Sequence, residues 1–198
     1  MLNPSRVMCS QDTSDEDLVR MVANHSDKTA FELLVKRHQA RLRLYLRGLT
    51  GTDAAADDLA QETFFKVFRA IPKFEFQSSF KTWLMAVARN TFLDYVRLAG
   101  NRSQASNNGD AYLFYAQLSQ ADTASLDAPM LAIDLNKALT LLSAAEREVI
   151  VHCYFADLTM TETAFILGMP LGTVKTHSHR ALAKLRSQMS AWDVARTK

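Results

Sequence analysis

The stretch MTETAFIL (160–167) is followed by GMP (168–170) and then by GTVKTHSHRALAKLRSQM (172–189). Apolar residues recur at helical spacing on both sides of the Gly-Met-Pro segment, and glycine and proline mark a tight turn. A short helix, a turn and a longer basic helix together predict a helix-turn-helix. The second helix has an inward side at helical spacing, made by Val174, Ser178, Ala181, Leu182 and Leu185.

The outward side of that second helix is rich in hydrogen-bond donors. It holds Thr173, Lys175, Thr176, His177, His179, Arg180 and Lys184. Such side chains near a helix N-terminus suit base edges and phosphates in a major groove. From Leu171 onward the chain has six bases and one acid, whereas residues 101–170 have three bases and eight acids. The formal net charge of +2 hides a basic end, which favours DNA binding over a merely solvated helix.

Three longer amphipathic helices are predicted upstream, over residues 30–49, 54–71 and 80–98. Ser14 or Asp15 can cap a shorter acidic helix before them. The first long helix has an apolar stripe made by Phe31, Leu34, Val35, His38, Leu42, Tyr45, Leu46 and Leu49. The second has a polar face with Asp58, Gln61, Glu62 and Arg69, and Phe65 lies on this polar face. An aromatic ring there indicates an interaction surface, because a monomer would gain nothing by exposing it.

A loop with two aromatic residues, KFEFQSS (73–79), separates the second and third long helices. Ser79 can cap the third helix, and Trp83 lies on its core side. We expect Lys81, Arg89, Asn90 and Arg97 on the remaining surface of that helix. Aromatic side chains beside donors can hold unstacked nucleotides, although a loop phenylalanine often only covers the core.

Composition changes after residue 100. The run NRSQASNNGD (101–110) is polar and rich in Gly, Asn and Ser, as linkers are, and AYLFYAQL (111–118) could form a short docked helix. Helical periodicity resumes at Leu131. We therefore predict an all-α protein with two small helical domains, at 15–100 and 129–190, joined by a flexible linker over 101–128.

Other classes of protein are disfavoured. The two cysteines, Cys9 and Cys153, have no paired spacing, so neither a disulfide framework nor a zinc site is predicted. The N-terminus lacks the apolar core of a signal peptide, and no run reaches the roughly 18 apolar residues of a membrane span. Asp57, Asp58 and Glu62 could suggest paired catalytic acids. No glycine loop or nucleophile accompanies them, so catalysis is not predicted. We expect a cytoplasmic protein that is not an enzyme and needs no cofactor or metal.

The segment DDLAQETFFKVFRAIPKFEFQSSFKTWLMAVARNTFLDYVR (57–97) resembles region 2 of the sigma factor family. LLSAAEREVIVHCYFADLTMTETAFILGMPLGTVKTHSHRALAKLR (141–186) resembles region 4. No segment resembles regions 1.1 or 3 of the family, and in this the chain resembles the extracytoplasmic-function (ECF) group. The resemblance implies promoter-specific transcription initiation with core RNA polymerase, stress-responsive regulation and an anti-sigma partner.

The resemblance also implies roles for individual residues. Asp58, Gln61, Glu62 and Phe65 match positions that dock on the clamp helices of the polymerase β′ subunit, and region 4 is expected on the β flap. The candidates for melting and reading the -10 element are Phe74, Phe76, Gln77, Ser78, Arg89 and Asn90. The candidates for reading the -35 element are Thr173, Lys175, Thr176, His177, His179, Arg180 and Lys184.

Three positions depart from the family pattern. Ser143 stands where proline is common, Thr163 where isoleucine is usual, and His177 where arginine is common. The last change leaves the base preference open. Two alternatives also stay open at this point: a response-regulator-type activator, whose terminal helix-turn-helix carries a similar TVK-x-H string, and an adaptor that binds polymerase without DNA.

Overall fold

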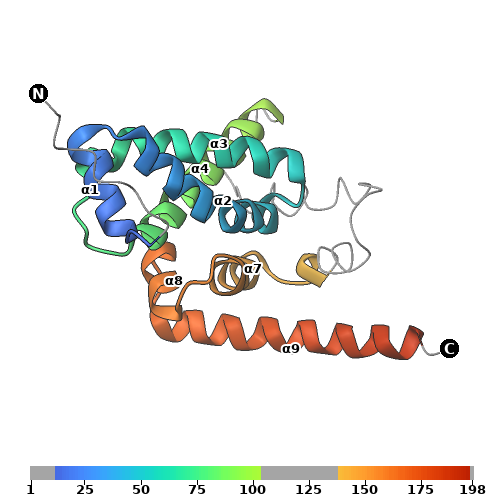
Figure 1. Cartoon of the computed structure of the whole chain (residues 1–198). Helices are drawn as coiled ribbons and strands as arrows, with labels where there is room; N and C mark the ends of the chain where they lie inside the picture. The colour runs from blue at the N-terminus through green and yellow to red at the C-terminus, as the bar shows by residue number, and fades with distance from the viewer. Residues whose placement is uncertain (1–11, 104–137, 197–198) are drawn as a thin grey trace, which may run out of the picture.

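A computed structural model describes residues 12–103 and 138–196, and within these ranges every regular element is helical (Figure 1). The N-terminal module consists of α1 (Asp15–His25), α2 (Lys28–Thr50), α3 (Asp53–Ala70), the short 3-10 helix η1 (Ile71–Lys73) and α4 (Phe80–Ser103). The C-terminal module consists of α7 (Ala144–Ile150), the π-helical segment η2 (Val151–Phe155), α8 (Met160–Leu167) and α9 (Leu171–Arg196). The prediction of an all-α fold with two helical domains is confirmed.

Local sequence signals begin and end the helices. The Ser14 side chain accepts a hydrogen bond from the Asp17 backbone and caps α1, as the sequence predicts. Asp27 caps α2 in the same way, and Gly51 ends it with φ of 79°, a left-handed conformation that suits glycine. Ser79 accepts a hydrogen bond from the backbone of Thr82 at the start of α4.

The N-terminal core is formed where α2, α3 and α4 pack together. The predicted stripe of α2 is largely correct, because Leu34, Leu42, Tyr45, Leu46 and Leu49 are all buried. Phe31, Val35 and His38 of the same stripe are half-buried. Burial of this apolar surface is the main term that holds the bundle together.

The C-terminal module forms the helix-turn-helix that the sequence predicts. Thr159 begins α8 with a capping box to Glu162, and Gly168 ends it with φ of 64°. Ser143 and Glu146 make a second capping box at α7, so serine replaces proline there without loss of a cap. On α9, the predicted inward residues Val174, Ser178 and Ala181 are buried, and Leu182 and Leu185 are half-buried.

The two modules pack against each other. Val151, Ala156 and Leu158 belong to the same core cluster as the N-terminal helices, while Leu139, Leu142, Ile150 and Ala181 form a smaller core of their own. Figure 1 shows α7 and α8 between the N-terminal bundle and the long α9. The sequence predicts two modules but gives no sign of this shared interface.

The expected linker lies mostly outside the described residues. Helix α4 continues to Ser103, three residues into the range 101–128. The predicted short helix over 111–118 and the periodicity at 131–135 fall outside the description. None of the helices in the described parts of the chain is long and apolar enough to cross a membrane.

Candidate nucleic-acid interface

The first surface lies on α3 and comprises Asp58, Gln61, Glu62 and Phe65, called the α3 surface below. All four residues are exposed, and Phe65 keeps 61% of its area open to solvent. The opposite side of α3 is buried through Leu59, Thr63 and Val67, so helix geometry forces this polar face outward. The predicted exposure of Phe65 is therefore confirmed, and its contact with polymerase stays a prediction.

Two charged neighbours hold parts of the α3 surface in place. The Arg69 guanidinium lies 5.6 Å from the centroid of the Phe65 ring, within the range of a cation–π contact. The Lys66 ammonium lies 2.9 Å from the Glu62 carboxylate. An exposed ring already held in one orientation loses less conformational entropy when a partner binds it.

The second surface is the loop over residues 73–79, called the aromatic loop below. Phe74 is half-buried, with its ring centroid 4.6 Å from that of Trp83 and 4.9 Å from that of Phe76. Trp83 packs against the core, as the sequence suggests, and its contact with Phe74 also supports the loop. The Arg20 guanidinium of α1 lies 5.1 Å from the exposed Phe76 ring.

Phe76 has a backbone φ of 56°, in the left-handed region that a bulky residue seldom adopts. Such a conformation costs about 1–3 kcal/mol and persists only when the surroundings impose it. The Gln77 side chain donates a hydrogen bond to Glu75 at 2.8 Å, and Ser78 is half-buried. The aromatic loop therefore has a defined conformation that keeps the Phe76 ring outside the core.

The sequence places Lys81, Arg89, Asn90 and Arg97 on the free surface of α4, and the structure corrects two of them. Asn90 and Arg97 are exposed. Arg89 lies 3.3 Å from the Glu148 carboxylate, and Lys81 lies 3.4 Å from that of Asp157, both acids of the C-terminal module. The sequence misses this because the partners lie 59 and 76 residues away along the chain.

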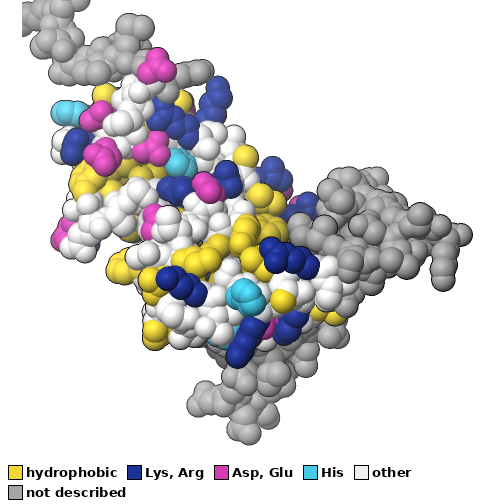
Figure 2. Space-filling view, turned by 90° about the horizontal axis from the view of Figure 1, so that it is seen from below, with side chains coloured by type: hydrophobic (Ala, Val, Ile, Leu, Met, Phe, Trp, Pro, Cys, Tyr) yellow, Lys and Arg dark blue, Asp and Glu magenta, His cyan; other side chains and the backbone are white. Residues whose placement is uncertain are grey.

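The third surface is the outward side of α9, called the α9 surface below. Thr173, Lys175, Thr176, His179, Arg180 and Lys184 are exposed, as the helical spacing predicts. The Thr176 hydroxyl donates to the Gly172 carbonyl at 2.9 Å and so satisfies itself within the helix. Figure 2 shows dark-blue and cyan side chains spread over the lower face of the molecule, beside an apolar band.

Two candidates on α9 differ from the rest. His177 is half-buried, and its Nδ1 is buried without a hydrogen-bond partner. The Lys184 ammonium lies 2.7 Å from the Glu146 carboxylate of α7. Burial would raise the pKa of the Glu146 carboxyl, but hydrogen bonds from Lys184 and Ser143 outweigh it and lower that pKa. Lys184 is therefore partly committed to holding α9 on α7.

Other polar residues between the modules were not identified from the sequence. The buried His152 donates from Nδ1 to the Glu148 carbonyl at 2.7 Å and accepts at Nε2 from the Tyr45 hydroxyl at 3.0 Å. Burial and the nearby Arg89 lower the pKa of His152 to about 4, so the ring is neutral. A histidine within the apolar run EVIVHCYF was the only available signal.

Thr163, the residue at the unusual position, is also accounted for. Its side chain is fully buried in α8, and its hydroxyl lies 3.4 Å from the Cys153 sulfur. A hydroxyl can stand in place of the ethyl branch of isoleucine here because it has a hydrogen-bonding partner.

Comparison with known proteins matches both modules to one family. Residues 34–102 match the family model for Sigma-70 region 2, and residues 138–187 match that for Sigma-70, region 4. The chain is 30% identical over 173 residues to the RNA polymerase sigma-H factor of Pseudomonas aeruginosa, covering 84% of this chain and 89% of that protein. It is 31% identical over 161 residues to the ECF RNA polymerase sigma factor SigE of Mycolicibacterium smegmatis, covering 81% of this chain but only 62% of that protein's length.

A solved structure is similar as well. The sigma factor RpoE from Bartonella quintana, crystallised with the anti-sigma factor NepR, matches with a TM-score of 0.63 and 25% identity over 81% of this chain and 96% of that one. Both regions occur in the order expected for a sigma factor, and the relatives align over most of this chain. These matches support neither a response-regulator-type activator nor an adaptor that binds polymerase without DNA. The chain belongs to the extracytoplasmic-function RNA polymerase sigma factors of the sigma-70 family.

Proposed function

We propose that this chain binds core RNA polymerase and directs it to promoters through separate -10 and -35 contacts. The observation that carries the proposal is the exposed Phe65 on an otherwise polar helix face within the region 2 module. Buried aromatic anchors dominate the binding energy of protein interfaces. The α3 surface is thus suited to the polymerase β′ clamp helices. The family resemblance of region 4 supports its docking on the β flap.

For the -10 element, the proposed readers are the aromatic loop and the exposed Asn90. A strained loop that presents an aromatic ring to solvent suits an unstacked base, because stacking on such a ring stabilises it by about 1–3 kcal/mol. Arg89 belongs to this set only if the C-terminal module moves away from it, since it now contacts Glu148.

For the -35 element, the α9 surface is the proposed reader. From Gly172 the helix begins with small and polar residues, so its N-terminus can approach a groove closely. Lys175 and Arg180 are five residues apart, about 7.5 Å along the axis, which corresponds to roughly two base pairs. Lys184 is a weaker candidate because it contacts Glu146, and His177 is a weaker candidate because it is half-buried.

We also propose that an anti-sigma factor controls the chain. Two similar structures support this: the RpoE–NepR complex and the complex of CnrH with the cytosolic domain of CnrY, the latter with a TM-score of 0.62 and 25% identity. The proposal includes action in the cytoplasm, where core polymerase works, and no catalysis by the chain itself.

Run-off transcription with purified core polymerase on genomic DNA, followed by mapping of start sites, tests the function. The chain should co-elute with core enzyme and give discrete start sites that share two short elements. Co-elution without start sites would favour an adaptor, and specific DNA binding by the chain alone, with no co-elution, would favour an activator.

A further inference from the structure

One arginine of α1 lies over the exposed ring of the aromatic loop. The Arg20 guanidinium is 5.1 Å from the centroid of the Phe76 ring. Leu18, Val19 and Val22 bury the opposite side of α1, so helix geometry turns Arg20 outward. None of the promoter contacts proposed above includes this residue. Arg20 is thus an exposed cation beside a loop that is proposed to meet DNA.

Arg20 is held in this position by its own helix. Its Nη1 donates to the Asp17 carboxylate at 3.3 Å, and the Ser14 hydroxyl donates to the other oxygen of that carboxylate at 2.7 Å. Ser14 is also the N-cap of α1, so the acceptor of Arg20 is fixed to the start of the helix. Within the described ranges Asp17 is the only hydrogen-bonding partner of Arg20. Most of the five guanidinium N–H groups are therefore left for a ligand.

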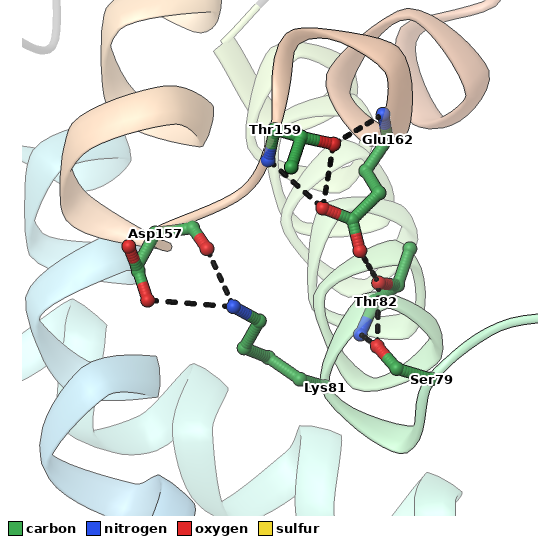
Figure 3. Close-up of polar contacts among 6 residues, drawn as sticks. All are labelled: Ser79, Lys81, Thr82, Asp157, Thr159 and Glu162. Carbon is green, nitrogen blue, oxygen red and sulfur yellow. Dashed lines mark hydrogen bonds and ion pairs between the residues drawn. The ribbon is translucent and has the colours of Figure 1, made fainter.

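The end of the aromatic loop is fixed without help from α1. Ser79, the last residue of the loop, hydrogen-bonds Thr82 at 2.7 Å, and the Thr82 hydroxyl donates to the Glu162 carboxylate of α8 (Figure 3). A cation–π contact at an exposed site adds only modestly to the stability that such anchors provide. Holding the loop in place is therefore a poor explanation for the position of Arg20 over Phe76.

Three aromatic rings and Arg20 contact one another in sequence. Trp83 contacts Phe74, Phe74 contacts Phe76, and the Arg20 guanidinium lies over Phe76. The Arg20 side chain is 56% exposed, so this row ends in solvent at the guanidinium plane. A base that stacked on the covered face of Phe76 would displace Arg20, whereas a base that stacks on Arg20 keeps every contact of the row. Proteins hold unstacked bases on guanidinium planes as well as on aromatic rings.

A hollow of about 380 Å³ runs along α1 beside this guanidinium, and Arg20 forms part of its wall. The other residues that line it are Thr13, Asp17, Met21, Asn24 and His25. Met21 supplies apolar surface, and the Asn24 amide and the His25 imidazole are groups that hydrogen-bond the edges of bases. The Asp17 carboxylate repels a phosphate, so the wall favours a base over the nucleic-acid backbone as the occupant.

We propose that Arg20 is a nucleotide-binding residue, on whose guanidinium plane one unpaired base of the promoter stacks with its edge in the hollow along α1. The inference rests on the proposed function for the source of that base, and it adds a surface of α1 to the proposed -10 readers. Phe76 then supports Arg20 and does not stack on this base itself. Asp17 fixes the plane from the other side.

The test removes the side chain and the base separately. Holoenzyme is reconstituted from core polymerase and the full chain, and the DNA is a promoter found by run-off transcription, with a single-stranded non-template -10 segment. A series of these DNAs lacks one base at a time and keeps the sugar and phosphate. Arg20→Ala should bind the intact DNA about tenfold more weakly than the unchanged chain, within the range for one stacked base. At one abasic position this difference should vanish, because the partner of Arg20 is already missing.

Arg20→Lys separates stacking from charge. Lysine keeps the charge but has no planar group, so it should bind the intact DNA as weakly as Arg20→Ala while the salt slope stays that of the unchanged chain. Full rescue by lysine, together with a salt slope smaller by about 0.7 in Arg20→Ala, would indicate a phosphate contact and overturn the stacking role. Undiminished or tighter binding by Arg20→Ala would show that the bare Phe76 ring receives the base, and would also overturn it.

Arg97→Ala is the matched control. The Arg97 Nη1 lies 3.2 Å from the carboxylate of Asp94, three residues before it, as the Arg20 Nη1 lies 3.3 Å from that of Asp17. Neither cation–π contact within the described residues includes Arg97. Any weakening caused by Arg97→Ala should therefore be the same at every abasic position. A loss that depends on position as strongly as that of Arg20→Ala would contradict the proposal.

The melting temperature of Arg20→Ala should stay close to that of the unchanged chain, because Arg20 is exposed and the loop has its own anchors. If alanine does melt the loop, Arg20→Gln repeats the comparison. Weakening by the same factor on every DNA of the series would make Arg20 a purely structural residue and overturn its contact with a base. An unchanged chain that transcribes while its Arg20 variants show no position-specific loss retains the sigma function and loses this inference. An unchanged chain that gives no start sites loses both.

Discussion

The two helices proposed to meet promoter DNA, α4 and α9, differ in what covers them. Among the residues that the structure describes, no module covers the outward side of α9, and Lys175 and Arg180 are exposed. On α4, by contrast, Arg89 has a side chain only 15% exposed and meets Glu148, which is 3% exposed. One of the two helices proposed to read DNA is therefore open in this structure, and the other is partly covered. Changes at the covered contacts should alter stability, whereas changes on the open surfaces should alter binding.

The largest effect is expected from Arg147→Ala, which removes a buried guanidinium between the modules. The Gly48 carbonyl would lose both donors and the interface would lose a packed side chain, so unfolding should cost about 3 kcal/mol less. Urea unfolding followed by circular dichroism measures this. Arg186→Ala, at an exposed position on α9, is the control and should change the free energy of unfolding little.

The pH dependence of stability should show a contribution from His152. Its pKa falls from an ordinary value of 6.5 to about 4 in the folded chain, so the unfolded chain binds the proton more readily. At about 1.4 kcal/mol per pH unit this corresponds to about 3 kcal/mol, present above pH 6.5 and lost as pH falls from 6.5 to about 4. His152→Gln should flatten the stability profile in this window. If the free energy of unfolding of His152→Gln falls just as steeply over this pH range, groups other than His152 cause the decline.

On the open side, Phe65→Ala should weaken binding to core polymerase by about 2 kcal/mol, because an exposed aromatic anchor is lost. Its melting temperature should stay close to that of the unchanged chain, since the ring is not part of the core. Titration of labelled protein with core enzyme gives the affinity. A large loss of melting temperature, or undiminished affinity, would contradict the docking assignment.

Arg180→Ala separates base reading from phosphate contact on α9. If Arg180 contacts a guanine in bidentate fashion, its loss should remove about 1–3 kcal/mol of discrimination at one promoter position. The holoenzyme affinity for a series of promoter variants measures this. Weakening by the same factor across the series, with a salt slope smaller by about one, would instead indicate a phosphate contact.

The smallest effect is expected from Asn90→Ala, at an exposed position on the otherwise partly covered α4. Loss of one hydrogen bond to a base should reduce open-complex formation by about 1 kcal/mol while core binding is kept. Permanganate footprints of the melted region compare the variant with the unchanged chain. Identical footprints would remove Asn90 from the proposed set of -10 readers.

The sequence by itself determined the elements and most of the outward faces. Helical periodicity buries Leu42 and Leu46 and exposes Phe65, and Gly168 with Pro170 makes the turn before α9. The Ser14 and Ser143 caps were also predictable, because a cap acts on backbone donors within three residues. These features depend on local spacing, and local spacing is what a sequence displays directly.

Only the tertiary structure decided which of these faces meet. Tyr45 and His152 are 107 residues apart, and Arg147 and Gly48 are 99 apart, yet each pair forms a buried hydrogen bond. Charge and periodicity correctly suggest that Lys81 and Arg89 leave the core of their own module. They do not say whether water, DNA or another module covers them, because that depends on how two helical bodies pack, and packing is decided by the shapes of both surfaces together.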